Sequence, residues 1–69
     1  MENLFKQRLK ELRKEKQLTQ KQVAKALNKS ETGYASWEQG LSEPCINDLI
    51  AICKYYNVTL DYLVGVSEI

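Results

Sequence analysis

Apolar side chains recur along this chain at intervals of three and four residues, whereas no segment alternates apolar and polar positions with a period of two. Such spacing is typical of amphipathic α-helices and not of strands. The first stripe is formed by Leu4, Phe5, Leu9 and Leu12, and it predicts a helix that ends near Lys16.

The second and fifth helices are expected to open with the same arrangement of side chains. Thr19 precedes the second helix as its N-cap, Gln22 completes a capping box three residues later, and Asn28 ends the helix. Thr59 is the corresponding cap of the fifth helix, which Gly65 closes.

Two further helices are predicted between these. Ser30 caps a helix over residues 31–39, and Gly40 supplies the left-handed residue after its end. Beyond Pro44, a fourth helix is expected to reach Asn57. Its predicted inner face has the spacing i, i+3, i+4, i+7 and consists of Ile46, Leu49, Ile50 and Cys53.

Five short helices joined by short turns predict one compact all-α domain over residues 1–69. Only residues 28–30 separate the second helix from the third. A turn that short makes two helices cross steeply. It therefore predicts a helix-turn-helix over about residues 20–40, whose second helix can enter a DNA major groove.

The composition suits one small globular domain, with 69 residues, 43% of them hydrophobic and 28% charged. No apolar run reaches the length of about 18 residues that indicates a membrane-spanning helix. The first residues, MENLFKQRLK, mix charged and apolar side chains, unlike a signal peptide. A cytoplasmic protein without a membrane partner is therefore expected.

Charge is distributed unevenly, although the net charge is only +1. Residues 1–29 hold nine Lys and Arg and three Glu, a balance of +6, whereas residues 30–69 hold one Lys and six acids, a balance of −5. This asymmetry indicates either a basic face for a polyanion or several solvated helix faces that differ in sign.

The side chains offer no set suited to catalysis or metal binding. Histidine is absent, and there is no Gly-rich phosphate loop. Cys45 and Cys53 are the two cysteines, and their spacing of eight fits no zinc pattern. We therefore expect a protein that is not an enzyme and that needs no cofactor, metal ion or small-molecule ligand.

The stretch TQKQVAKALNKSETGYASWEQG, followed by a proline, an amphipathic helix and NVTLDYLVG, resembles the Cro/repressor-type (Xre-like) helix-turn-helix family, which includes the lambdoid phage repressors. The resemblance covers roughly residues 4–65. The features that match at fixed spacing are Gln20 opening the second helix, Ala24 at the helix crossing, Asn28 in the turn, and the aromatic–Glu pair Trp37 and Glu38 before a glycine.

The resemblance implies a transcriptional regulator, expected to be a repressor, that binds double-stranded DNA sequence-specifically with the helix over residues 31–39 in the major groove. Gln20, at a helix N-terminus, and the neighbouring Lys21 would contact phosphates. The other positions expected to bind DNA are Ser30, Glu31, Thr32, Tyr34, Ser36 and Gln39. The resemblance further implies that Arg13 pairs with Glu38, as a partly buried ion pair between the first and third helices.

Three residues leave alternatives open. Glu31 could accept a hydrogen bond from cytosine N4, or could only complement the positive end of the helix dipole. Tyr34 could pack in the core, or could reach a phosphate with its hydroxyl. Glu43 stands where relatives often carry Lys or Arg. Together with the acidic second half of the chain, it favours the alternative of an antitoxin- or anti-repressor-like interaction module with weak or no DNA binding.

A homodimer on a pseudo-palindromic operator is expected, because one short recognition helix contacts too few base pairs to select a site within a genome. A two-fold dimer places two such helices about one DNA turn apart. The expected interface consists of apolar residues in the last helix and the C-terminal tail, namely Leu60, Val64, Val66 and Ile69.

Overall fold

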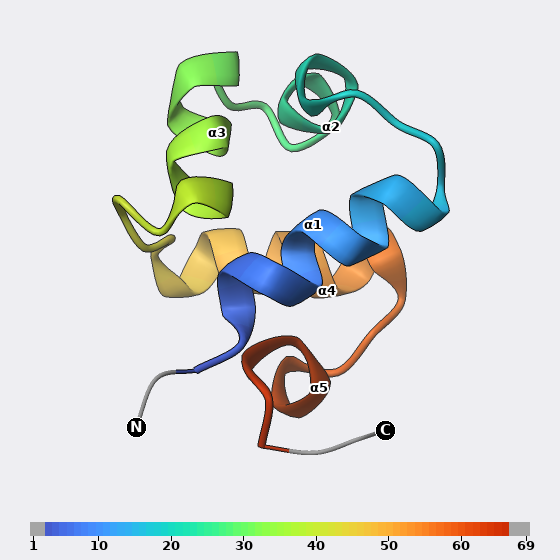
Figure 1. Cartoon of the computed structure of the whole chain (residues 1–69), viewed down its shortest axis with the longest axis vertical. Helices are drawn as coiled ribbons and strands as arrows, with labels where there is room; N and C mark the ends of the chain where they lie inside the picture. Colours follow the sequence, from blue (N-terminus) through green and yellow to red (C-terminus); the bar gives the residue numbers. More distant parts are fainter. Residues whose placement is uncertain (1–2, 67–69) are drawn as a thin grey trace.

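The computed structural model describes residues 3–66, and within that range it contains five α-helices and no strand (Figure 1). The helices are α1 (Phe5–Glu15), α2 (Gln20–Ala26), α3 (Glu31–Gln39), α4 (Ile46–Tyr56) and α5 (Leu60–Val64). The five-helix, all-α architecture predicted from the sequence is confirmed.

Side-chain caps determine where three of the helices begin. Thr19 Oγ1 accepts a hydrogen bond from Gln22 N at 3.1 Å, and Gln22 Oε1 accepts one from Thr19 N at 2.8 Å, which completes the predicted capping box. Ser30 and Thr59 cap α3 and α5, each by accepting a backbone N–H three residues further on. Left-handed residues end the last three helices as predicted, and these are Gly40, Asn57 and Gly65.

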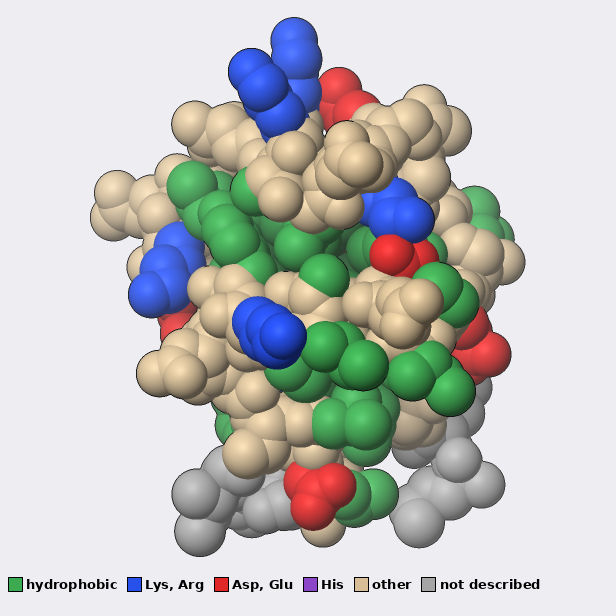
Figure 2. All heavy atoms as spheres, turned by 180° about the vertical axis from the view of Figure 1, so that it is seen from behind, with side chains coloured by type: hydrophobic (Ala, Val, Ile, Leu, Met, Phe, Trp, Pro, Cys, Tyr) green, Lys and Arg blue, Asp and Glu red, His purple; other side chains and the backbone are tan. Residues whose placement is uncertain are grey.

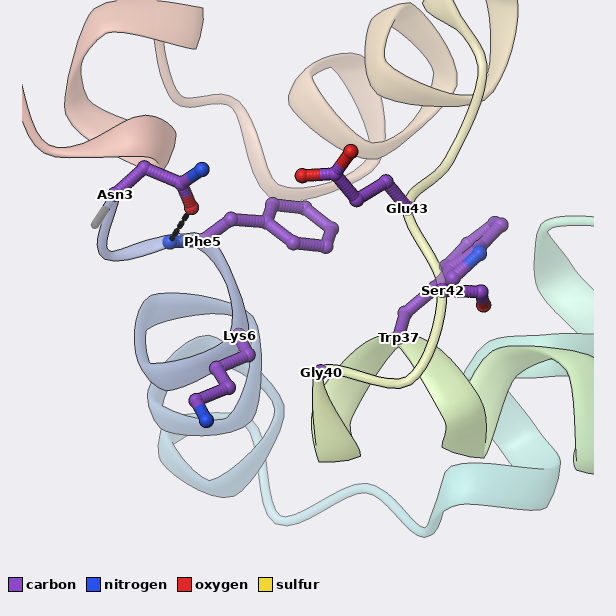
Figure 3. A pocket seen from close by; sticks show the side chains of 7 residues that line it. All are labelled: Asn3, Phe5, Lys6, Trp37, Gly40, Ser42 and Glu43. Carbon is purple, nitrogen blue, oxygen red and sulfur yellow. Dashed lines mark hydrogen bonds between the residues drawn. The ribbon is translucent and has the colours of Figure 1, made fainter. Parts of the chain in front are cut away.

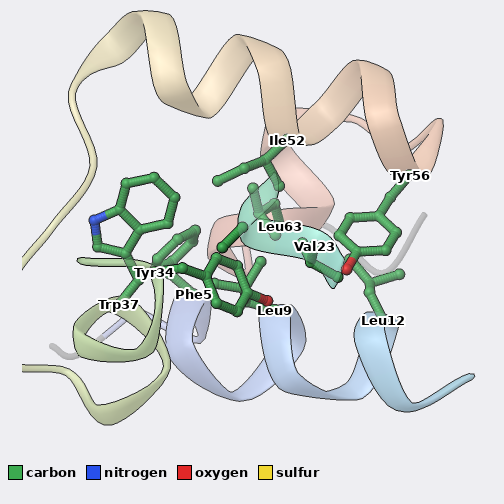
Figure 4. Close-up of a cluster of buried hydrophobic side chains, with 10 residues drawn as sticks. Phe5, Leu9, Leu12, Val23, Tyr34, Trp37, Ile52, Tyr56 and Leu63 are labelled. Carbon is green, nitrogen blue, oxygen red and sulfur yellow. The ribbon is translucent and has the colours of Figure 1, made fainter. Parts of the chain in front are cut away.

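All five helices contribute to one hydrophobic core (Figure 4). Its buried members are Phe5, Leu9 and Leu12 of α1, Val23 and Ala24 of α2, Tyr34 and Trp37 of α3, Ile52 and Tyr56 of α4, and Leu63 of α5. The rings of Tyr34 and Trp37 meet edge to face with their centroids 5.9 Å apart, a favoured aromatic arrangement. Because α1 packs against both α3 and α5, it holds α3 to the rest of the domain.

The predicted inner face of α4 is wrong in two of its four residues. Ile46 and Ile50 are 74% and 47% exposed, whereas Ile52 and Tyr56 are buried. The stripe that packs inward has the predicted spacing but begins three residues later, and it consists of Leu49, Ile52, Cys53 and Tyr56. Periodicity alone cannot choose between two overlapping stripes on one helix, because both satisfy the same spacing.

The connection between α2 and α3 has the steep crossing expected of a helix-turn-helix. Figure 1 looks nearly along the axis of α2, while α3 lies across the view. Asn28 adopts the left-handed conformation with φ of 61°, and Lys29 N donates to Ala24 O at 2.8 Å, so the chain turns within three residues. Lys29 Nζ lies 2.9 Å from Asp48 Oδ1, which ties this turn to α4.

The helices are short and closely packed. The Cα radius of gyration is 11.0 Å, and a compact domain of this length is expected to have about 11 Å. Over residues 3–66, no helix combines the length and the apolar character that crossing a bilayer requires.

Candidate nucleic-acid interface

The predicted recognition helix α3 has one polar, exposed side and one buried side. The exposed residues at its two ends are Glu31, Thr32 and Gln39. The buried residues are Tyr34, Trp37 and Glu38. Thr32 and Gln39 are seven residues apart and therefore lie on the same side of the helix, so their polar groups can enter a groove together.

Ser30 is engaged as the cap of α3. Its Oγ accepts a hydrogen bond from Gly33 N at 3.0 Å. A Cβ added to Gly33 would lie only 3.0 Å from that oxygen, so the glycine leaves room for the cap. Ser30 is also exposed, and its contact with DNA stays a prediction.

The hydroxyl of Ser36 is already hydrogen-bonded within the protein. It donates to Gly33 O at 2.7 Å. Since a hydroxyl has a single proton, the neighbouring Ser42 hydroxyl must be the donor in the bond between the two serines. Ser36 therefore fixes the loop after α3 and keeps one acceptor position for DNA. Sequence reasoning missed Ser42, because a contact between a helix and the following loop leaves no periodic signal.

The structure places Tyr34 in the core, which corrects the expectation that this residue binds DNA. Tyr34 is 0% exposed, and its hydroxyl is buried without a hydrogen-bond partner among the described residues. Figure 4 shows its ring among the core side chains. Burial raises the pKa of Tyr34. Helical spacing put Tyr34 on the inward side, but it did not indicate how far the hydroxyl reaches.

Replacing Tyr34 with Phe should leave DNA affinity unchanged, because the hydroxyl cannot reach a phosphate. The free energy of unfolding should change by no more than about 1 kcal/mol, because the buried hydroxyl that is removed makes no hydrogen bond of good geometry. Denaturant unfolding and DNA titration of Y34F beside the unmodified protein measure both quantities. A uniform loss of affinity with normal stability would restore Tyr34 as a DNA contact.

Arg13 and Glu38 form the predicted ion pair between α1 and α3. Arg13 Nε lies 2.7 Å from Glu38 Oε2, and Arg13 Nη2 lies 3.0 Å from Glu38 Oε1. The Glu38 side chain is 1% exposed and that of Arg13 is 14% exposed. Burial alone would raise the pKa of Glu38, but hydrogen bonding to the carboxylate, above all from Arg13, outweighs burial and holds that pKa below its ordinary value. This two-point pair therefore fixes the orientation of α3 against α1.

Gln20 lies at the start of α2, but its side chain is turned toward α3. Its Nε2 donates to Glu38 Oε1 at 3.1 Å, which leaves one amide proton and the amide oxygen for other partners. Lys21, beside it, is exposed. A phosphate contact by either residue stays a prediction. The hydrogen bond to Glu38 fixes the position of the Gln20 amide group, and so the place at which this group would contact a phosphate.

The residues predicted for a dimer interface adjoin a larger apolar face. Leu60 and Val66 are 47% and 73% exposed, Val64 is half-buried, and Ile69 lies outside the described residues. Figure 2 shows hydrophobic side chains gathered on this side of the molecule, over α4 and α5. A groove on this face is lined by Ile46, Leu49, Ile50, Cys53, Lys54 and Leu60. The two isoleucines that were expected in the core therefore belong to this face.

A hollow of about 200 Å³ lies between the start of α1 and the loop after α3 (Figure 3). Its lining consists of Asn3, Phe5, Lys6, Trp37, Gly40, Ser42 and Glu43. The volume is below the range of about 300–1,000 Å³ that is usual for small-molecule sites. In the part of the chain that the structure describes, no three His, Cys, Asp or Glu side chains are grouped to hold a metal ion.

Sequence reasoning also missed a row of lysines on α1. Lys6, Lys10 and Lys14 line a groove of about 520 Å³ together with Gln39 of α3. Their spacing of four residues was visible in the sequence. The family resemblance placed only Arg13 of this helix next to α3, and the periodicity of α1 did not show that the lysine row lies beside the recognition helix.

Comparisons with known proteins identify related sequences and structures. A family model described as helix-turn-helix matches residues 9–63. The transcriptional activator BcrR of Enterococcus faecalis is 38% identical over 65 residues, which are 94% of this chain and 32% of BcrR. The chain spans 32–59% of the length of the curated relatives that it matches.

Two solved structures share the fold. A transcriptional regulator from Listeria innocua superimposes with a TM-score of 0.89 at 32% identity, covering 94% of this chain and 61% of that one. The P22 c2 repressor, solved in complex with a synthetic operator, superimposes with a TM-score of 0.84 at 25% identity, covering 91% of this chain and 96% of that one.

Proposed function

The chain belongs to the helix-turn-helix family, and on this basis we propose that it is a transcriptional regulator that binds double-stranded DNA sequence-specifically. In this proposal α3 lies in the major groove, with Glu31 and Thr32 toward the base edges. Gln20 and Lys21 contact phosphates and set the position of the protein on the duplex. Repression is the expected effect, because a bound protein can block access to the DNA it occupies.

The observation that carries this proposal is the exposed polar side of α3, a helix that is held in place at its C-terminal end. Arg13 anchors α3 to α1 through Glu38, and Ser42 anchors the loop that follows through Ser36. A helix that is already positioned loses little conformational freedom on binding, which favours affinity. The complex of the P22 c2 repressor with an operator supports the same use of the shared fold here.

Selection of binding sites from random duplex DNA tests the proposal, followed by titration of the selected duplex over a range of salt concentrations. We expect a single consensus to be enriched. The logarithm of its affinity should fall linearly with the logarithm of salt concentration, because bound phosphates release counterions. No enrichment and no salt dependence would refute the proposed function.

We further propose that the protein binds as a homodimer on a pseudo-palindromic operator, with Leu60, Val64, Val66 and Ile69 in the interface. The exposure of Leu60 and Val66 and the neighbouring apolar side chains Ile46 and Ile50 support this side of the molecule as the interface. Burying exposed apolar area against a second copy is favourable at about 25 cal/mol per Å² before the cost of association.

Two protomers should occupy each selected operator, which analytical ultracentrifugation of the complex measures directly. L60E should weaken the pairing, because a carboxylate would then be buried in an apolar interface. D61N is a suitable control, since it changes charge at the exposed neighbouring position. Saturation with one protomer per operator would contradict the dimer.

A protein-interaction module that keeps the fold is the second candidate. Glu43 is exposed in the loop after α3 and Glu31 is exposed on its first turn, and both carboxylates oppose the approach of phosphates. Binding to a protein partner, with no salt-dependent affinity for any duplex, would favour this candidate over DNA recognition.

A further inference from the structure

The lysine row of α1 lies beside the C-terminal end of the recognition helix. Lys6, Lys10 and Lys14 follow one another at intervals of four residues, so about 6 Å of helix rise separates each from the next. All three are exposed, and together with Glu38 and Gln39 of α3 they line one groove of about 520 Å³.

The charge of this groove is not neutralised within the described part of the molecule. The ion pairs found among residues 3–66 are Arg13 with Glu38 and Lys29 with Asp48, and neither includes a lysine of the row. Because Arg13 neutralises Glu38, the remaining carboxylate of the lining is that of Glu11. Three ammonium groups against one carboxylate leave the groove positively charged.

Lys6 has a structural contact that accounts for its position in the row. A Cβ built on Gly40 would lie 3.3 Å from Lys6 Nζ, so this ammonium group stands beside the residue that ends α3. The C-terminal end of a helix attracts cations through the helix dipole. Lys10 and Lys14 lie one and two turns further along α1, away from that helix end, and are not explained by it.

We propose that Lys10 and Lys14 bind phosphates of the DNA backbone that flanks the bases contacted by α3. The inference rests on the proposed function, because it assumes that α3 enters the major groove. Gln39, which the family resemblance implies as a contact with the DNA backbone, lines the same groove, and Gln20 is hydrogen-bonded to Glu38 in its wall. A DNA strand whose phosphates contact Gln20 and Gln39 would therefore pass next along Lys10 and Lys14.

The chemistry of lysine fits the backbone better than the bases. An ammonium group is a compact point charge, which suits phosphate oxygens and does not discriminate between base edges. Lys10 and Lys14 would therefore extend the contact with the backbone and add affinity for every sequence. This second contact with the DNA backbone would offset the repulsion between the DNA phosphates and the carboxylates of Glu31 and Glu43.

Paired substitutions with equal loss of charge test this assignment. K10Q/K14Q removes two lysines that line the groove, whereas K16Q/K25Q removes two exposed lysines that do not. Long mixed-sequence duplex DNA is the probe, and the measured quantity is the slope of log affinity against log salt. Circular dichroism of both variants establishes that they fold.

We expect the slope of K10Q/K14Q to become shallower by about 1.8, because each phosphate contact contributes about 0.9. The slope of K16Q/K25Q should stay close to that of the unmodified protein. Equal slopes for the two double variants would overturn the role of Lys10 and Lys14 and leave the proposed function intact. If the unmodified protein shows no salt-dependent binding, the proposed function fails and the assignment fails with it.

Discussion

Replacement of Arg13 by Met should lower the free energy of unfolding by about 3–5 kcal/mol, because the buried Glu38 carboxylate loses its counter-charge. Arg13 Nη1 also donates to Leu18 O at 3.0 Å, so the segment that leads into α2 loses an anchor in the same change. Trp37 is 7% exposed and packs in the core, so its fluorescence is a suitable signal for denaturant unfolding.

The double variant R13M/E38L separates a direct interaction from two unrelated losses. A buried ion pair can often be replaced by apolar side chains of similar size with little cost, so the double variant should recover much of the stability that R13M loses. If the costs of the two single variants simply add, the residues do not interact.

Acid unfolding provides a second measurement on the same pair. The pKa of Glu38 is lower in the folded protein than its ordinary value of 4.5. The carboxylate therefore contributes stability that is fully present above that value and is lost as the pH falls through the folded pKa. R13M/E38L lacks this group, so its stability should depend less on pH in the acid range than that of the unmodified protein.

The positions of the five helices could be predicted because the signals that begin and end a helix are local in the sequence. A cap such as Thr19 or Ser30 acts on a backbone N–H within three residues, and Asn57 needs only its own left-handed conformation. Local signals could not predict which side of α4 packs into the core. Ile46 and Ile52 are equally apolar, and their burial depends on where α4 lies against the other helices.

The candidate site was predictable in part through the family resemblance. The resemblance supplied Glu31 and Thr32 as positions that face DNA, and it supplied the pair of Arg13 with Glu38. The burial of the Tyr34 hydroxyl and the bond between Ser36 and Ser42 depend on packing between segments, which no local pattern encodes.

The second large effect concerns which residues discriminate between DNA sequences. Thr32 offers a methyl group to thymine and a hydroxyl to other bases, so T32A should relax the preference at one or two base pairs by about 1–3 kcal/mol. K21Q should instead weaken all sequences alike and reduce the salt slope by about one. Q20A is a less clean control than K21Q, because it also removes the hydrogen bond to Glu38.

Glu31 gives the sharpest test of sequence reading by α3, because its two possible roles predict opposite results for E31Q. If the carboxylate accepts a hydrogen bond from cytosine N4, the substitution should change the preferred base at one position in each half-site. If the carboxylate only complements the helix dipole, the consensus should stay the same. Affinity for every duplex should then rise, because a charge that repels phosphate is removed. Binding-site selection with both proteins in parallel distinguishes the two, and an unchanged consensus would leave Thr32 and the remaining acceptor of Ser36 to discriminate between bases.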